Sequence, residues 1–186
     1  MFGFIRRIGN FFMDIIEVFV VSMSVFIVVY LFLMQPHQVK GNSMFPTFHD
    51  GEYLMTDKVT YKTRMPKRGD VIVFKAPVNE DFDFIKRVIG EPGDRVMVKN
   101  NRVFINGKEL KEEYLPPEYT TKASNYLQEG QEVTVSEGTI FAFGDNRGHS
   151  SDSREWGPVP YKNIIGRAFF RYWPLNKAGI ITNPTY

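Results

Sequence analysis

An apolar segment from Phe11 to Met34 constrains the fold of this chain most, because only isolated polar residues interrupt it. Its second part, Val18–Met34, has no formal charge over 17 residues. A membrane-spanning helix needs roughly 17–25 such residues. The apolar part of a cleavable leader is usually about 7–15 residues long and is followed by small residues. The sequence continues here as Gln-Pro-His-Gln, so a retained membrane anchor is predicted, with a cleaved leader as the alternative.

The charges around this segment predict its orientation. Arg6 and Arg7 precede it, and little positive charge follows directly after it. Because positive residues near a span stay on the cytoplasmic side, we expect three regions. These are a cytoplasmic N-terminus over residues 1–10, a transmembrane anchor over residues 11–34 and an extracytoplasmic domain over residues 35–186.

The composition narrows the classes of function. A net charge of +2 over 186 residues is too balanced to argue for a nucleic-acid partner. The absence of cysteine excludes a disulfide framework, a thiolate nucleophile and a cysteine-ligated metal. The 17 Phe and 9 Tyr provide enough aromatic side chains for a substantial core.

The chain after the anchor is predicted to be mainly β. Asn100-Asn101 and Asn106-Gly107 are turn dipeptides that tolerate a positive φ between apolar runs. Residues 108–130 are polar and show no period, which indicates an irregular excursion or flap. No long helix is expected here. The expected strands are 71–74, 83–89, 95–98, 102–105, 132–135, 139–143 and 164–173.

Three kinds of hydrolytic site can be compared with the sequence. A metal site is disfavoured, because His37, His49 and His149 lie far apart and none has an HExxH spacing. Asp145 and Asp152 could form a catalytic carboxylate pair, but both have arginine neighbours, so ion pairs are the better interpretation. The third kind is a hydroxyl nucleophile activated by a nearby base.

Ser43 is a candidate nucleophile, since it lies on a bend between Gly41-Asn42 and Pro46, although ordinary turns have the same pattern. Its base could be a histidine, His49 or His149, or a lysine with a neutral amine. Lys86 is the best lysine, because alternation along a strand gives it apolar neighbours and burial lowers a lysine pKa. Most lysines in strands reach solvent instead, so pattern alone leaves the base open.

Four stretches, in this order, resemble the conserved boxes of bacterial type I signal peptidases. They are NSMFPT at 42–47, GDVIVF at 69–74, KRVIGEPGD at 86–94 and GDNRGHSSDSR at 144–154. The single N-terminal anchor resembles the short, Gram-positive-like members. The resemblance extends from the anchor to about Trp173. It implies one transmembrane helix followed by an extracytoplasmic catalytic domain built as an antiparallel β-sheet or partial barrel.

The resemblance implies a role for each matching side chain. Ser43 would be the nucleophile and Lys86 the general base of a Ser-Lys dyad that acts through an acyl-enzyme. Ser150 would orient the lysine amine, and the Ser43 N–H would bind the oxyanion. Gly41 stands where many Gram-negative members carry a second oxyanion donor, which leaves that donor open. The implied ion pairs are Asp145 with Arg87 and Asp152 with Arg154.

The same resemblance implies a substrate and a location. The substrate would be an exported preprotein with an Ala-x-Ala type site, bound as a strand beside residues 39–43 and 83–86. Its small side chains would enter pockets lined by Val39, Met44, Phe84 and Ile85, although Met44 could equally be a core residue. No cofactor is implied. Membrane lipid is an implied partner, the secretion translocon is a further candidate, and the location is the outer face of the bacterial cytoplasmic membrane.

Two other classes of protein compete with this interpretation. A non-catalytic anchored relative would lack the nucleophile or the base, but Ser43 and Lys86 are both present. A self-cleaving Ser-Lys protease of the repressor type would carry a DNA-binding helix-turn-helix where this chain has its apolar segment. A Ser-His-Asp hydrolase is a minor alternative, because neither His49 nor His149 has a supporting carboxylate setting in the sequence.

Overall fold

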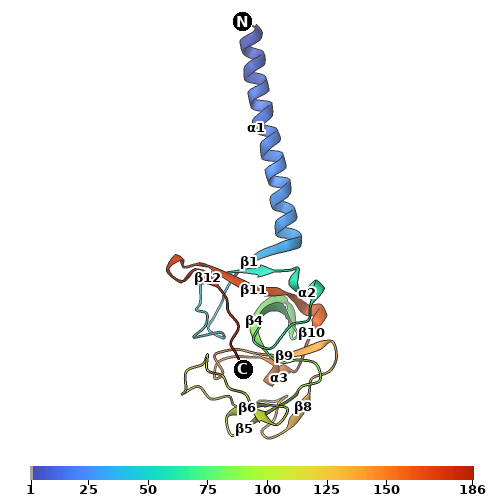
Figure 1. The fold of residues 1–186 in the computed structure, drawn as a ribbon, viewed down its shortest axis with the longest axis vertical. Coiled ribbons are helices and arrows are strands. Elements are labelled where there is room, and N and C mark those ends of the chain that lie inside the picture. Colours follow the sequence, from blue (N-terminus) through green and yellow to red (C-terminus); the bar gives the residue numbers. More distant parts are fainter. Residues whose placement is uncertain (1) are drawn as a thin grey trace.

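One long helix stands away from a β domain (Figure 1). The computed structural model describes residues 2–186, and Met1, part of the expected cytoplasmic segment, lies outside them. Helix α1 (Phe2–Val28) continues into the π-helical segment η1 (Val29–Leu33). The apolar stretch Gly9–Leu33 has 25 residues, none of them buried. At about 1.5 Å per residue it is about 37 Å long, enough to cross a hydrocarbon core of roughly 30 Å.

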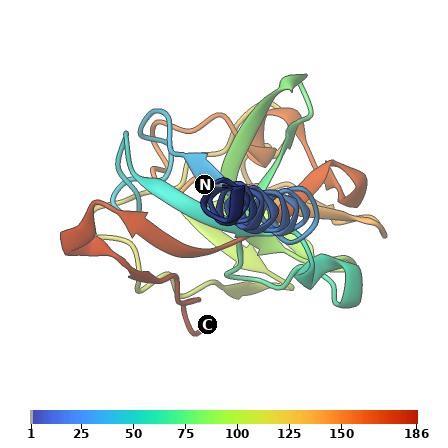
Figure 2. The same ribbon diagram turned by 90° about the horizontal axis from the view of Figure 1, so that it is seen from above.

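The larger sheet carries the part of the chain that follows the helix. It has eight strands in the order β1-β2-β11-β3-β4-β9-β10, with β12 paired to β11, and every pair is antiparallel. Seen from above, α1 projects over the middle of the β domain (Figure 2). The strands are β1 (Met34–Gln38), β2 (Tyr53–Asp57), β3 (Val71–Ala76), β4 (Asn79–Gly90), β9 (Thr139–Phe143), β10 (Val159–Pro160), β11 (Ile164–Trp173) and β12 (Gly179–Ile180).

A smaller sheet lies at the end of the domain far from α1 (Figure 1). Its four strands, in the order β7-β6-β5-β8, are β5 (Arg95–Lys99), β6 (Arg102–Ile105), β7 (Lys108–Glu109) and β8 (Glu132–Thr134). Asn100 and Asn101 join β5 to β6 with φ of 51° and 62°. Two successive residues with positive φ match the twist of a tight hairpin, as the sequence predicts.

The remaining helices are short, and so the mainly β class is confirmed for the described residues. They are α2 (Thr60–Thr63), α3 (Ser153–Trp156) and the 3-10 turns η2 (Tyr161–Asn163) and η3 (Leu175–Lys177). Met34, expected at the end of the anchor, already pairs with Asp57 in the β1–β2 ladder. The excursion at 108–130 contains β7, one isolated parallel bridge from Glu129 to Val98 and otherwise irregular chain.

Strand β4 takes part in all three apolar clusters of the domain. Ile89 belongs to the cluster of the smaller sheet, and Ile85 packs against the cluster that contains Met44 and Phe48. Val88 lies in the third cluster, where Phe84 packs against it. Residues at the junction of three cores have little freedom to move, because protein interiors are closely packed. The second half of this strand, residues 84–90, is therefore a rigid platform for the side chains that it carries.

Candidate active site

Lys86 lies in the middle of β4, opposite Ile72 of β3. Its side chain is only 4% exposed, and Nζ lies 5.2 Å from the centre of the Phe84 ring. Burial lowers the pKa of Lys86 from 10.5 to about 8, although the carboxylates of Asp152 and Asp145 oppose the shift. A substantial fraction of this amine is therefore neutral near pH 8.

Ser43 lies on the bend between β1 and β2, and its hydroxyl meets the lysine. Lys86 Nζ is 2.7 Å from Ser43 Oγ. The bend starts at Gly41, whose φ of +78° favours glycine, and the Phe45 N–H donates to Asn42 O over 3.1 Å. Met44 and Phe48 anchor the bend, because both side chains are buried in one apolar cluster.

The loop at 144–152 holds the Ser43 bend from the other side. The Asn146 backbone N–H donates to Ser43 O, and Asn146 Nδ2 donates to Asn42 O, each over 3.0 Å. A Cβ at Gly144 would overlap both Ser43 O and Ser150 Oγ, so the loop approaches this closely only because residue 144 is glycine. The position of Ser43 therefore depends on backbone contacts with this loop.

A buried carboxylate links the bend, the loop and the lysine strand. Asp145 accepts from Arg87 Nε and Nη2, over 2.9 Å and 2.7 Å, and both side chains are buried. The Thr47 hydroxyl, four residues after Ser43, donates to the same carboxylate over 2.6 Å. Arg87 follows Lys86 on β4, so Asp145 fixes the bend relative to the lysine.

A second buried ion pair shapes the end of the same loop. Arg154 Nε and Nη2 each donate to Asp152 over 2.8 Å, and the Gly144 N–H donates to Asp152 over 2.9 Å. Burial alone would raise the pKa of Asp152, but the hydrogen bonds and charge of Arg154 hold it below its ordinary value. Asp152 therefore stays ionised near the Lys86 amine.

Several residues from the sequence-based hypotheses take no part in the contact between Ser43 and Lys86. Ser150 Oγ is buried but forms no hydrogen bond among the described residues, so its expected bond to Lys86 is absent here. His49 contacts Glu52 and Lys177, and His149 is exposed. Within residues 2–186, no cluster of three His, Asp or Glu side chains could hold a metal.

The residues expected to line the substrate pockets differ in exposure. Met44 is fully buried and Val39 is 4% exposed, so neither side chain faces solvent in this structure. Phe84 and Ile85 are half-buried on β4. Strand β9 pairs with β4 only from Arg87 onward, whereas β3 pairs with residues 83–86. The edge of residues 83–86 opposite β3 therefore has no strand partner among residues 2–186.

Sequence reasoning missed the residues that hold the two loops together. Asn146 and Arg147 lie inside the last box and Thr47 ends the first box, but the pattern assigns no role to them. Arg147 is buried and donates to Glu112, Thr121 Oγ1 and Gly144 O. The excursion at 108–130 is thus attached to the loop beside Ser43. Nothing in the sequence pairs Glu112 with Arg147, because 35 residues separate them.

Comparison with known proteins identifies the class to which this fold and site belong. The family model described as "Signal peptidase, peptidase S26" matches residues 12–173. The chain belongs to this family and is a signal peptidase, a hydrolase, with a helix suited to membrane anchoring.

The alignments with individual relatives cover most of this chain and most of each relative. The chain is 36% identical to "Probable signal peptidase I-1" of Synechocystis over 95% of this chain and 90% of that protein. It is 42% identical to the signal peptidase I of Bacillus caldolyticus over 79% of this chain and 84% of that protein. It is 35% identical to a Staphylococcus aureus signal peptidase IB over 88% of this chain and 91% of that protein.

Proposed function

We propose that this chain removes signal peptides from exported preproteins with Ser43 as nucleophile and Lys86 as general base. The observation that carries the proposal is the 2.7 Å contact between Ser43 Oγ and the buried Lys86 Nζ. A serine hydroxyl is a weak nucleophile without a base. A lysine can act as that base only when its amine is neutral, and a pKa of about 8 makes the neutral form accessible.

The proposed reaction has two halves. In the first, neutral Lys86 takes the Ser43 proton while Oγ attacks the scissile carbonyl, and the proton then passes to the leaving amine as the acyl-enzyme forms. In the second, Lys86 takes a proton from a water whose oxygen attacks the acyl carbonyl. The bond to Ser43 Oγ then breaks, the product leaves as a carboxylic acid, and Lys86 returns the proton to Ser43 Oγ. The Ser43 N–H is the proposed oxyanion donor, since it donates to no acceptor among the described residues.

The proposed substrate path runs along the unpaired edge of β4. An extended peptide can add as a strand beside residues 83–86, with main-chain hydrogen bonds that do not depend on sequence. Phe84 and Ile85 then limit the size of the peptide side chains, which would favour Ala-x-Ala sites. Entry into the space near Met44 and Val39 would require these buried side chains to shift.

Ser150 is the proposed positioning residue for the amine. Its hydroxyl is buried without a partner and lies in the loop that contacts Ser43. Rotation of this hydroxyl toward Lys86 would satisfy it and hold the amine during proton transfer. We place the catalytic domain, residues 35–186, on the outer face of the membrane, with the translocon as a further proposed partner.

Cleavage of a purified preprotein in detergent tests this proposal. The wild-type chain should cut after Ala-x-Ala, with the metal chelator EDTA present. Ser43→Ala and Lys86→Ala should each lose at least about 10³-fold in rate, because removal of a nucleophile or base has effects of this size or larger. His49→Ala is the matched control and should cut normally. An active Lys86→Ala protein, or an inactive His49→Ala protein, would contradict the dyad.

A further inference from the structure

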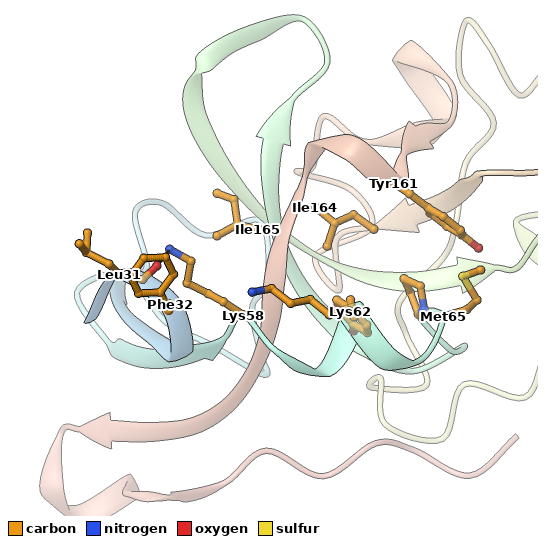
Figure 3. A pocket seen from close by; sticks show the side chains of 10 residues that line it. Leu31, Phe32, Lys58, Lys62, Met65, Tyr161, Ile164 and Ile165 are labelled. Carbon is orange, nitrogen blue, oxygen red and sulfur yellow. Dashed lines mark hydrogen bonds between the residues drawn. The ribbon is translucent and has the colours of Figure 1, made fainter. Parts of the chain in front are cut away.

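A pocket opens where the membrane helix joins the β domain (Figure 3). Its volume is about 280 Å³, and it lies on the surface beside α2, β11 and the end of η1. Small-molecule pockets usually measure roughly 300–1,000 Å³. This one therefore suits a headgroup-sized ligand, and the proposed catalytic mechanism makes no use of it.

The lining of the pocket combines positive charge with apolar surface. Lys58 and Lys62 both line it: the Lys58 amine lies beside Phe32, and the Lys62 amine points toward the Lys58 side chain (Figure 3). None of the ten lining residues is acidic. An anion with an attached apolar group fits such a surface better than a neutral or cationic ligand.

The two lysines are not neutralised by nearby carboxylates. Lys58 Nζ donates to Leu31 O over 2.9 Å and to the amide oxygen of Gln35 over 3.4 Å, both uncharged acceptors. Lys62 is exposed, and its amine makes no hydrogen bond or ion pair among the described residues. The neighbouring Asp57 carboxylate accepts from Thr60 and from the Val59 N–H instead. Two positive charges therefore remain available to a ligand.

The position of the pocket indicates which class of ligand it can bind. Leu31 and Phe32 belong both to the apolar stretch Gly9–Leu33 and to the pocket wall, and both are more than half exposed. A span of about 37 Å places its end near the headgroups of the leaflet that faces the domain. Met65, on the opposite wall, exposes 64% of its surface. We propose that this pocket binds the phosphate of an anionic phospholipid, whose acyl chains lie along the exposed end of the helix.

Titration of the full-length protein in a neutral detergent with short-chain phospholipids tests this proposal. We expect dihexanoyl phosphatidylglycerol to bind at least about 10-fold more tightly than dihexanoyl phosphatidylcholine. A lysine near an anionic lipid strengthens binding about fivefold, so Lys62→Gln should weaken phosphatidylglycerol binding about fivefold and Lys58→Gln/Lys62→Gln about 30-fold. Phosphatidylcholine binding should weaken less than phosphatidylglycerol binding, because the choline cation offsets the charge of its phosphate.

Two further variants separate the site from general effects of charge and folding. Lys67→Gln removes one positive charge from an exposed lysine that does not line the pocket, and it should bind like wild type. Lys58→Arg/Lys62→Arg keeps both charges and should retain the preference for phosphatidylglycerol. Loss of Lys58 could disturb the end of the membrane helix, where its amine bonds to Leu31 O. Lys62 has no such partner among the described residues, so the Lys62→Gln variant tests binding independently of that effect.

Three outcomes would overturn the assignment. The first is equal binding of the two lipids by wild type. The second is unchanged phosphatidylglycerol binding by both Lys62→Gln and the double glutamine variant. The third is binding of soluble glycerol phosphate as tight as that of phosphatidylglycerol, which would indicate a site for free phosphate esters and not for lipid.

Discussion

Lys86 shows how one residue can be useful to a reaction and harmful to stability. Its ammonium form loses hydration when it enters the core, and the nearby Asp152 and Asp145 carboxylates recover only part of that loss. The result is a pKa of about 8 in place of 10.5. The folded state therefore holds more neutral amine at a given pH than the unfolded chain does, and the neutral amine is the form that a general base requires.

The pH dependence of cleavage should follow the titration of Lys86. Protonation below its pKa removes the base, so kcat/KM should fall about tenfold per unit well below pH 8 and level off above about pH 9. Steady-state cleavage of a preprotein between pH 5.5 and 10 measures this profile. Lys86→Arg should be inactive at every pH, because a guanidinium stays charged. A profile that is flat from pH 6 to 9 would contradict the assignment of the base.

Replacement of Lys86 by methionine should abolish cleavage and stabilise the fold. At pH 7 the lysine is protonated in both states, and the depressed pKa then destabilises the folded state, on the order of 1–3 kcal/mol. Lys86→Met removes this penalty. Thermal unfolding should show a higher Tm for the variant below pH 8. The difference should shrink between pH 8 and 10.5, where the unfolded chain binds more protons than the folded one.

At the scale of elements, the loop at 144–152 decides whether the bend and β4 form one site. It contacts Ser43 through Asn146 and reaches Thr47 and Arg87 through Asp145. Arg147 attaches the excursion to the same loop. The attachments through Asp145 and Arg147 bury charged groups, and such groups are stable in the core only when they are paired.

Removal of the Asp145 charge should therefore destabilise the contacts among the Ser43 bend, the loop at 144–152 and β4. Asp145→Asn leaves Arg87 buried without a counter-ion, which typically costs about 3–5 kcal/mol. The matched control is Glu109→Gln, which breaks an ion pair with Arg102 that is largely exposed and should cost less than about 1 kcal/mol. Chemical denaturation in detergent compares the two free energies of unfolding. Similar losses for both variants would contradict the role of burial.

The sequence predicts those elements whose signals are local. The hairpin of β5 and β6 follows from Asn100 and Asn101, which adopt the required positive φ. Strand β1 was missed, because Pro36 and the polar residues around it do not resemble a buried strand. Strand β1 forms its hydrogen bonds with β2, which lies about 20 residues later in the chain. Local pattern carries no information about such pairing.

The features of the candidate site also fall into those that local pattern predicts and those that it does not. Alternation along β4 predicts apolar neighbours for Lys86, and the structure places the Phe84 ring 5.2 Å from its amine. The contact between Lys86 and Ser43 spans 43 residues, and only the resemblance to a family suggests it. Thr47 and Asn146 went unassigned, because a short polar side chain in a loop has the same pattern whether it supports a site or faces water.

At the scale of the molecule, the anchor determines where the site can act. The helix leaves the domain at β1, whose partner β2 joins the sheet that carries Lys86 (Figure 1). The domain is therefore held close to the membrane surface. A preprotein held in the same membrane by its apolar leader would diffuse with the enzyme in two dimensions, and such confinement raises the effective concentration of both.

The orientation of the whole chain can be tested with a single engineered cysteine, since the natural sequence has none. Lys111 is exposed and follows β7, a strand of the smaller sheet at the end of the domain far from α1 (Figure 1). Arg6 and Arg7 should keep the N-terminus in the cytoplasm, so Lys111→Cys should react with a membrane-impermeant maleimide in intact spheroplasts. In inside-out vesicles it should react only after detergent is added.

The charges before the span provide the control for this experiment. Arg6→Glu/Arg7→Glu removes the positive residues that hold the N-terminus in the cytoplasm and should place part of the population in the inverted orientation. That fraction would leave Lys111→Cys unlabelled in spheroplasts and cleave no exported preprotein. Labelling of the parent Lys111→Cys protein only in inside-out vesicles would show that the orientation is the reverse of the expected one. It would also place the proposed lipid pocket against the cytoplasmic leaflet.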